Sequence, residues 1–285
     1  MKKRRTSVQI CLVLGICLLT SLVSFCFANG DLTYRLWTQI RPYKSLDLQE
    51  VTLAETQEFT LAELQTAENV TVSNLMMLVN RDHPLPAGYE AILEEYNGAK
   101  MHPDMVEPYI ALRDRVQRET GMRIYVSSDY RTPEEQEDIL SESESGVAAE
   151  IGCSEHEAGL ALDVYAPYFG GEAFLKSAAG RRVNEICSQY GFIIRYPFGK
   201  ENITGITYEP WHLRYVGEVH ARLMAESGLT LEEYLDCLNP DTWYESEDCL
   251  ISRQSGETIV LPTEYTSCEI SPDNTGYYLI TVNQT

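Results

Sequence analysis

Two short stretches of the chain contain the residue types that bind a catalytic metal ion in hydrolases. Residues 154–163 (SEHEAGLALD) include His156 and Asp163, and residues 209–215 (EPWHLRY) include His212. A catalytic zinc site needs three protein ligands and an open fourth position for water. Two imidazoles and one carboxylate meet this need, so these three residues are predicted to hold one Zn²⁺ per chain. Either stretch alone is weak evidence, and the prediction depends on the pair.

A carboxylate accompanies the second histidine of the pair. Glu209 lies three residues before His212, where a strand is predicted to begin. It would lie close to the metal without being a ligand, which is where a general base takes a proton from the catalytic water. The other histidines, His83, His102 and His220, are expected at the surface or in packing roles.

Three predicted strands would position these residues. Residues 123–128 alternate and are rich in strand formers, and residues 192–196 and 211–216 are also predicted as strands. In the last of these, alternation places His212 and Arg214 on one face of the sheet.

Helices are predicted between and after the strands. In residues 104–120, apolar side chains recur on one face, and Gly121 is a natural stop. The apolar positions of that face are Met105, Tyr109, Leu112 and Val116. Another helix is predicted to end at Tyr190-Gly191, and two short helices are predicted near 217–226 and 231–238.

A strand-to-helix turn follows the first predicted strand. Thr132-Pro133 is a typical helix start, with threonine as the N-cap, proline at the first position and a glutamate three residues on. Asp129, Tyr130 and Arg131 therefore lie at a turn, which is a common place for a binding residue.

The two metal-binding stretches match a known pattern. The pattern S-x-H-x-x-G-x-A-x-D followed by E-P-W-H-L-R-Y-V resembles the VanY-type D-alanyl-D-alanine carboxypeptidases, zinc peptidases that share a fold with the Hedgehog signalling domain. The resemblance covers roughly residues 75–238. It implies an α+β fold of the Hedgehog/DD-peptidase type, with a small, mainly antiparallel sheet and helices on one side. It also implies His156, Asp163 and His212 as zinc ligands and Glu209 as the catalytic base.

The resemblance extends to residues that would bind substrate. The family's S-x-Y-R-S turn followed by glutamine corresponds to Ser128, Arg131 and Gln136 here. Arg131 would pair with the substrate carboxylate or the developing oxyanion, for which a guanidinium is well suited. Ser128, Gln136 and Ser154 would contact the substrate, and Tyr196 would line the pocket.

The chain departs from the family pattern at three places. Asp129 replaces the usual glycine of the turn, Thr132 replaces serine, and Glu157-Ala158 replaces a polar pair after the first histidine. None of these changes removes a ligand or the base. Asp129 adds a negative charge near Arg131, which puts substrate affinity or preference in question.

The expected function is removal of the terminal D-alanine from peptidoglycan stem peptides or precursors. The same zinc machinery could instead serve an L,D-carboxypeptidase, a D,D-dipeptidase or a wall endopeptidase. A cell-wall-binding module without catalytic activity is the alternative from another class, and the presence of Glu209 argues against it.

The N-terminus carries an export signal. Four basic residues at positions 2–5 precede an apolar run from Val8 to Ala28. This run has the length of a membrane anchor, yet Cys26-Phe27-Ala28 offers a cleavage site, so anchor and signal peptide both stay open. Either way, the rest is expected outside the cytoplasm of a bacterium, anchored to the membrane or secreted to the wall.

The 285 residues carry a formal net charge of −21, which excludes nucleic acid as a partner because phosphate binding needs clustered Lys and Arg. Residues 1–28 are the signal or anchor, and the acidic stretch 29–72 is expected to be a stalk or linker. Residues 73–238 are the expected zinc carboxypeptidase domain, and 239–285 a small β-rich appendage. The five cysteines outside the apolar run show no C-x-x-C spacing, so they are not expected to bind zinc.

Overall fold

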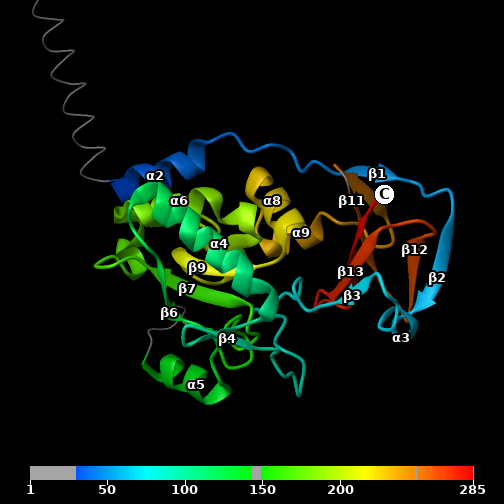
Figure 1. The fold of residues 1–285 in the computed structure, drawn as a ribbon, viewed down its shortest axis with the longest axis horizontal. Helices are drawn as coiled ribbons and strands as arrows, with labels where there is room; N and C mark the ends of the chain where they lie inside the picture. The colour runs from blue at the N-terminus through cyan, green and yellow to red at the C-terminus, as the bar shows by residue number, and fades with distance from the viewer. Residues whose placement is uncertain (1–29, 143–148, 248, 285) are drawn as a thin grey trace, which may run out of the picture.

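The computed structural model describes residues 30–142, 149–247 and 249–284. They form a first lobe, in which helices surround a four-stranded sheet, and beside it a second lobe built mainly of strands (Figure 1). The predicted signal or anchor at 1–28 lies outside the described residues. Among the residues that are described, no helix has the length and apolar character needed to span a membrane.

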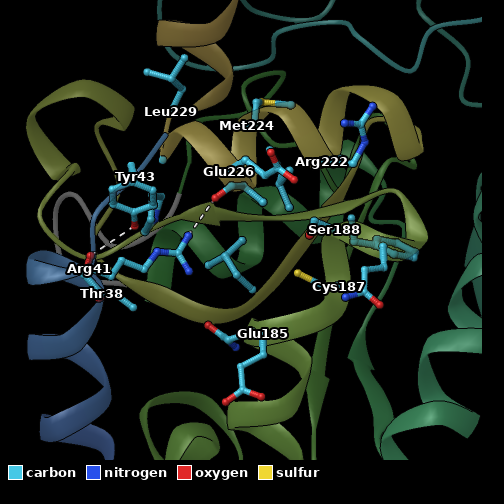
Figure 2. A pocket seen from close by; sticks show the side chains of 18 of the residues that line it. Thr38, Arg41, Tyr43, Glu185, Cys187, Ser188, Arg222, Met224, Glu226 and Leu229 are labelled. Carbon is cyan, nitrogen blue, oxygen red and sulfur yellow. Dashed lines mark hydrogen bonds between the residues drawn. The ribbon is translucent and has the colours of Figure 1, made fainter. Parts of the chain in front are cut away.

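The first described element is the helix α2 (Gly30–Ile40), at the edge of the first lobe. A cavity of about 930 Å³ lies beside it, and α6 (Ala178–Ile186) and α8 (Glu218–Ser227) contribute to its lining (Figure 2). The metal-binding histidines predicted from the sequence do not line this cavity.

The central sheet of the first lobe has four antiparallel strands in the order β6-β7-β9-β8. These strands are β6 (Tyr125–Ser128), β7 (Ala161–Tyr165), β9 (Glu209–Tyr215) and β8 (Phe192–Tyr196). Alternation gives the sheet two different faces. Leu162 and Leu213 belong to the core on one face, so Asp163 and His212 point to the other.

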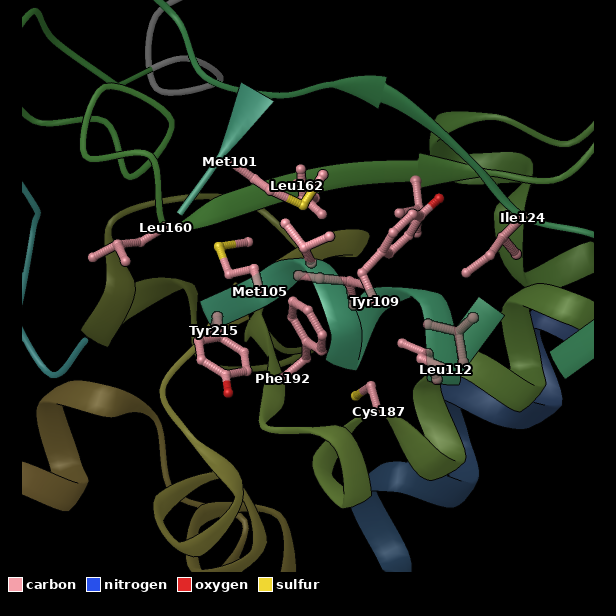
Figure 3. Packing of buried hydrophobic residues seen from close by; sticks show 14 of the residues in the cluster. Met101, Met105, Tyr109, Leu112, Ile124, Leu160, Leu162, Cys187, Phe192 and Tyr215 are labelled. Carbon is pink, nitrogen blue, oxygen red and sulfur yellow. The ribbon is translucent and has the colours of Figure 1, made fainter. Parts of the chain in front are cut away.

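The main helix, α4 (Pro103–Thr120), packs on the core face of this sheet (Figure 3). The predicted apolar face is confirmed, because Met105, Tyr109, Leu112 and Val116 are all buried. Gly121 ends the helix in the left-handed conformation, with φ 74°. Helix α6 and two short 3₁₀ helices, η1 (Gly171–Lys176) and η2 (Cys187–Tyr190), complete this side.

Smaller elements surround the sheet. They are the hairpin β4 (Glu94–Tyr96) and β5 (Ala99–Met101), and the helices α5 (Pro133–Glu142), α7 (Glu201–Thr204) and α9 (Leu231–Asp236). Thr230 and Glu233 form the capping box that begins α9. The expected α+β architecture, with an antiparallel sheet covered by helices on one side, is confirmed.

The second lobe is a six-stranded sheet in the order β1-β10-β11-β14-β13-β3, beside a two-stranded pair β12-β2. Its C-terminal strands are β10 (Trp243–Ser246), β11 (Cys249–Gln254), β12 (Thr258–Pro262), β13 (Ser267–Pro272) and β14 (Tyr278–Asn283). Its N-terminal elements are β1 (Gln49–Val51), β2 (Thr56–Thr60), α3 (Leu61–Leu64) and β3 (Val70–Val72).

Residues 49–72 are therefore folded against the C-terminal strands, so this part of 29–72 differs from the expected stalk or linker. The two outer strands, β1 and β3, have three residues each and expose most of them. Edge strands of this kind are held by backbone hydrogen bonds, so their composition resembles that of a polar linker. The division of the chain into domains stays a prediction.

Candidate active site

Three side chains converge on the face of the central sheet that lies opposite the helices. Asp163 on β7 pairs directly with His212 on β9, and His156 comes from the turn that precedes β7. One ligand atom from each residue lies within 4.8 Å of the other two. Gly159 makes the turn possible, since it has φ +72° and a Cβ there would lie 2.8 Å from Leu93 Cδ2.

The unpaired atoms of this cluster fit a metal ion. His156 Nε2 and Asp163 Oδ1 are buried and have no hydrogen-bond partner. His156 Nε2 lies 3.4 Å from Asp163 Oδ2, and His212 Nδ1 lies 3.1 Å from Asp163 Oδ1. Two imidazoles and a carboxylate suit a catalytic Zn²⁺ site with an open position.

Hydrogen bonds on the far side of each imidazole fix which nitrogen faces the centre. His156 Nδ1 donates to the Asp129 carbonyl oxygen at 2.7 Å, which leaves Nε2 free. His212 Nε2 donates to Glu155 Oε2 at 3.3 Å, which turns Nδ1 toward Asp163. Such outer partners set the tautomer and orientation of histidine ligands.

Glu155 is a functional residue that sequence reasoning missed. Its carboxylate is fully buried and accepts hydrogen bonds from Arg195 Nε at 2.6 Å and Arg214 Nη1 at 2.8 Å. Burial opposes its ionisation, but the two guanidinium groups and His212 hold the pKa of Glu155 well below its usual range. The only available signal was an acidic residue directly before the first histidine.

Glu209 lies beside the cluster, as expected of a general base. Its Oε2 is 3.7 Å from His212 Nδ1. Burial raises the pKa of Glu209 to about 7, and the nearby Asp163 carboxylate adds to the rise. Its position beside the three donors is the one expected of a group that takes a proton from a water molecule bound at their centre.

The predicted substrate residues of the turn lie together on one side of the cluster. Arg131 Nε donates to Ser128 Oγ at 3.0 Å, and its Nη1 donates to Gln136 Oε1 at 3.2 Å. Arg131 Nη2 also reaches Asp163 Oδ2 at 3.2 Å. The guanidinium is thus fixed next to Asp163, one of the three candidate metal ligands.

The two other residues predicted to contact substrate, Ser154 and Tyr196, lie beside the histidines. Ser154 is buried, and its Oγ accepts a hydrogen bond from the His156 backbone N–H at 3.3 Å. Tyr196 is also buried, with its ring centroid 4.8 Å from that of His212. Both therefore support the histidines directly.

The carboxylate of Asp129 contacts the neighbouring hairpin strand β5. Its Oδ2 accepts a hydrogen bond from the Lys100 backbone N–H at 2.5 Å, while its carbonyl oxygen holds His156. The unusual residue of the turn thus anchors the hairpin strand β5 and the first histidine.

The fold and the side chains at this site define a metallopeptidase of the Hedgehog/DD-peptidase type. Residues 98–218 match the family described as VanY: D-alanyl-D-alanine carboxypeptidase. The chain is 37% identical over 189 residues to the bifunctional D-Ala-D-Ala dipeptidase and D-Ala-D-Ala carboxypeptidase VanXYC of Enterococcus gallinarum, covering 58% of this chain and 95% of that protein. The chain belongs to the VanY D-alanyl-D-alanine carboxypeptidase family.

Further relatives and solved structures agree with this family assignment. A D-alanyl-D-alanine carboxypeptidase of Enterococcus faecalis is 36% identical, with 56% of this chain and 65% of that protein covered. The vancomycin resistance D,D-dipeptidase VanXYg, solved with a D-Ala-D-Ala phosphinate analogue, gives a TM-score of 0.66 at 25% identity over 81% of this chain and 99% of that one. A VanY D,D-pentapeptidase solved with Zn(II) gives a TM-score of 0.51 at 36% identity, over 56% of this chain and 98% of that one. The expected family, fold class and zinc peptidase chemistry are confirmed.

Proposed function

We propose that this chain is a zinc-dependent D-alanyl-D-alanine carboxypeptidase that removes the terminal D-alanine from peptidoglycan stem peptides or their precursors. His156, Asp163 and His212 would hold the zinc. The observation that carries this assignment is the pair of buried, unpartnered atoms, His156 Nε2 and Asp163 Oδ1, within a three-residue donor set. Family membership supports the substrate class.

Each remaining residue has a role that follows from its position. A zinc ion held here would polarise the scissile carbonyl group and the attacking water. Glu209, 3.7 Å from His212, would accept the proton of that water and return it to the leaving amine. Arg131, held by Ser128 and Gln136, would bind the terminal carboxylate or stabilise the oxyanion.

A dipeptidase activity on free D-Ala-D-Ala is the second candidate. The observation in its favour is the breadth of the match to VanXYg, which covers 81% of this chain, whereas the VanY structure solved with zinc covers 56%. The match to VanXYg therefore extends well beyond the predicted catalytic domain. We propose that this domain, residues 73–238, carries the catalytic residues.

Defined peptides separate these activities. Mass spectrometry should detect release of D-alanine from a pentapeptide ending in D-Ala-D-Ala, with zinc and not after chelation. A tetrapeptide ending in L-Lys-D-Ala, free D-Ala-D-Ala and a cross-linked peptide test the L,D-carboxypeptidase, dipeptidase and endopeptidase alternatives. No cleavage of any of them by zinc-loaded protein would favour the non-catalytic wall-binding module.

The role of Arg131 is tested with the same peptides. Arg131→Ala should reduce cleavage of a substrate with a free terminal carboxylate more than cleavage of its amidated analogue, because only the former loses an ion pair. Equal losses on both would reject the carboxylate-binding role and strengthen the endopeptidase alternative.

We also infer that the enzyme acts outside the cytoplasm, where peptidoglycan lies, and that residues 1–28 direct it there as an uncleaved anchor. The basic cluster and the 21-residue apolar run from Val8 to Ala28 support this location. Protease treatment of wall-stripped cells should degrade the enzyme while a cytoplasmic marker survives, and protection of both would reject the location.

A further inference from the structure

The helix α2 exposes several apolar side chains at the surface of the protein, while Tyr34 of the same helix lines the cavity on its inner side. Leu32, Leu36 and Ile40 recur every four residues and therefore share a face, and they are 42%, 51% and 79% exposed. Trp37, next to Leu36, lies between this face and the cavity beside α2, and it is 47% exposed. A helix on the surface of a soluble domain normally buries its apolar face and exposes its polar one. This exposed face, the α2 stripe, has the opposite arrangement.

Contacts on the inner side fix α2 in this orientation. The Arg35 guanidinium lies 5.1 Å from the centre of the Tyr208 ring. Arg41, directly after the helix, donates from Nη2 to the Ala225 carbonyl oxygen of α8 at 2.8 Å and lies over the Tyr43 ring, and Figure 2 shows it reaching toward α8. Turning the stripe inward would break these contacts.

The place of α2 in the chain indicates what covers the stripe. The apolar run ends at Ala28, only two residues before the helix begins at Gly30. Two residues span at most about 7 Å. The headgroup layer on each side of a bilayer is roughly 5–8 Å thick. If the run crosses the membrane, α2 must begin in or at the edge of that layer.

We propose that α2 lies along the membrane surface, with Leu32, Leu36 and Ile40 in the acyl boundary and Trp37 at the headgroup level. Interfacial helices bury one apolar face in this way, and tryptophan is enriched at that depth. The proposal rests on the uncleaved anchor proposed above. A lipid surface fits better than a second copy of the chain, because four side chains are far fewer than the roughly 20–30 residues per side of a stable protein interface.

The depth of Trp37 tests the proposal in the full-length chain. The protein is reconstituted into phosphatidylethanolamine/phosphatidylglycerol vesicles whose acyl chains are brominated near the headgroup, and tryptophan emission is compared with that in unbrominated vesicles. Bromine should quench part of the wild-type emission. The Trp37→Phe variant should lose most of that quenching, since Trp211 packs against the core around α4 and Trp243 is buried in the core of the second lobe.

Matched variants separate the stripe from general exposure. Leu36→Glu with Ile40→Glu should reduce the quenching at least twofold. Ile92→Glu, at a position 56% exposed outside α2, should leave it unchanged. Equal quenching in wild type and Trp37→Phe would overturn the proposal. Intact-mass measurement of the reconstituted protein reports separately on residues 1–28: their loss would reject the anchor, whereas their presence without Trp37 quenching rejects only the surface helix.

Discussion

Two buried histidine clusters in this protein differ in how completely their polar atoms are paired. At His220 on α8, both ring nitrogens have hydroxyl partners, at 2.8 Å from Tyr234 and 2.9 Å from Thr281. At the proposed zinc site, His156 Nε2 and Asp163 Oδ1 have none. Buried polar atoms are rarely left unpaired, so the second cluster is built to receive a ligand and the first is complete in itself.

The largest effect is expected from Glu209, which borders the unpaired cluster without being one of its three donors. Glu209→Gln should still bind zinc and fold, but its turnover should fall by about 10⁴-fold or more. This is at or above the upper end for general-base catalysis, because the same group also protonates the leaving amine. Elemental analysis measures zinc binding, thermal melting measures folding, and the rate of D-alanine release measures turnover. Glu107→Gln, on the exposed face of α4, is the control. Near wild-type turnover in Glu209→Gln would reject the mechanism.

Replacing one histidine in each cluster tests the comparison itself. His156→Ala should lose most of the bound zinc, since it removes one of only three protein ligands. His220→Gln should retain about one zinc per chain, because its partners are hydroxyl groups and no metal is expected there. Elemental analysis of both purified variants provides the measurement. Full zinc retention in His156→Ala, or loss in His220→Gln, would contradict the distinction.

Glu155 should have a smaller effect on the same measurement. It orients His212 from outside the metal centre, and mutation of such outer partners typically weakens metal affinity about 10–100-fold. Glu155→Gln keeps the shape but replaces the anionic acceptor that Arg195, Arg214 and His212 share. Competition with a zinc chelator measures the affinity, and circular dichroism controls for folding. An unchanged zinc affinity in the folded variant would reject the positioning role.

The parts of the site that the sequence predicts are local ones. The three donors and Glu209 lie within two short stretches, and the two strands that carry Asp163, Glu209 and His212 place them together. The buried face of α4 follows from helical periodicity. Glu155 could not be identified in this way, because its arginine partners lie 40 and 59 residues away and nothing local indicates that they meet.

In the second lobe, too, contacts between residues far apart in the sequence could not be predicted. Strands β12 and β14 contain apolar residues and are recognisable as β-rich segments. The edge strands of the six-stranded sheet, β1 and β3, are three residues long and are joined to β10 and β13 by backbone hydrogen bonds across almost 200 residues of sequence. Backbone pairing at that separation leaves no pattern in composition, so residues 49–72 resemble a linker.

The smallest predicted effect concerns the stability contributed by the fully paired histidine. Burial lowers the pKa of His220 from 6.5 to about 4. Between these values the unfolded chain binds a proton that the folded protein does not, so the free energy of unfolding falls as the pH drops from about 6.5 toward 4. At pH 5 this linkage amounts to about 2 kcal/mol, from about 1.4 kcal/mol per pH unit. His220→Gln keeps polar groups for Tyr234 and Thr281 but cannot titrate.

Urea unfolding of wild type and His220→Gln at pH 7.5 and pH 5, at equal zinc content, measures this difference. Other titrating groups affect both proteins alike, so their contributions cancel in the comparison. Wild type should therefore lose about 2 kcal/mol more than the variant between the two pH values. Equal losses would mean that His220 accepts a proton within the folded protein. The cluster would then not be complete in its neutral form, and its contrast with the zinc site would fail.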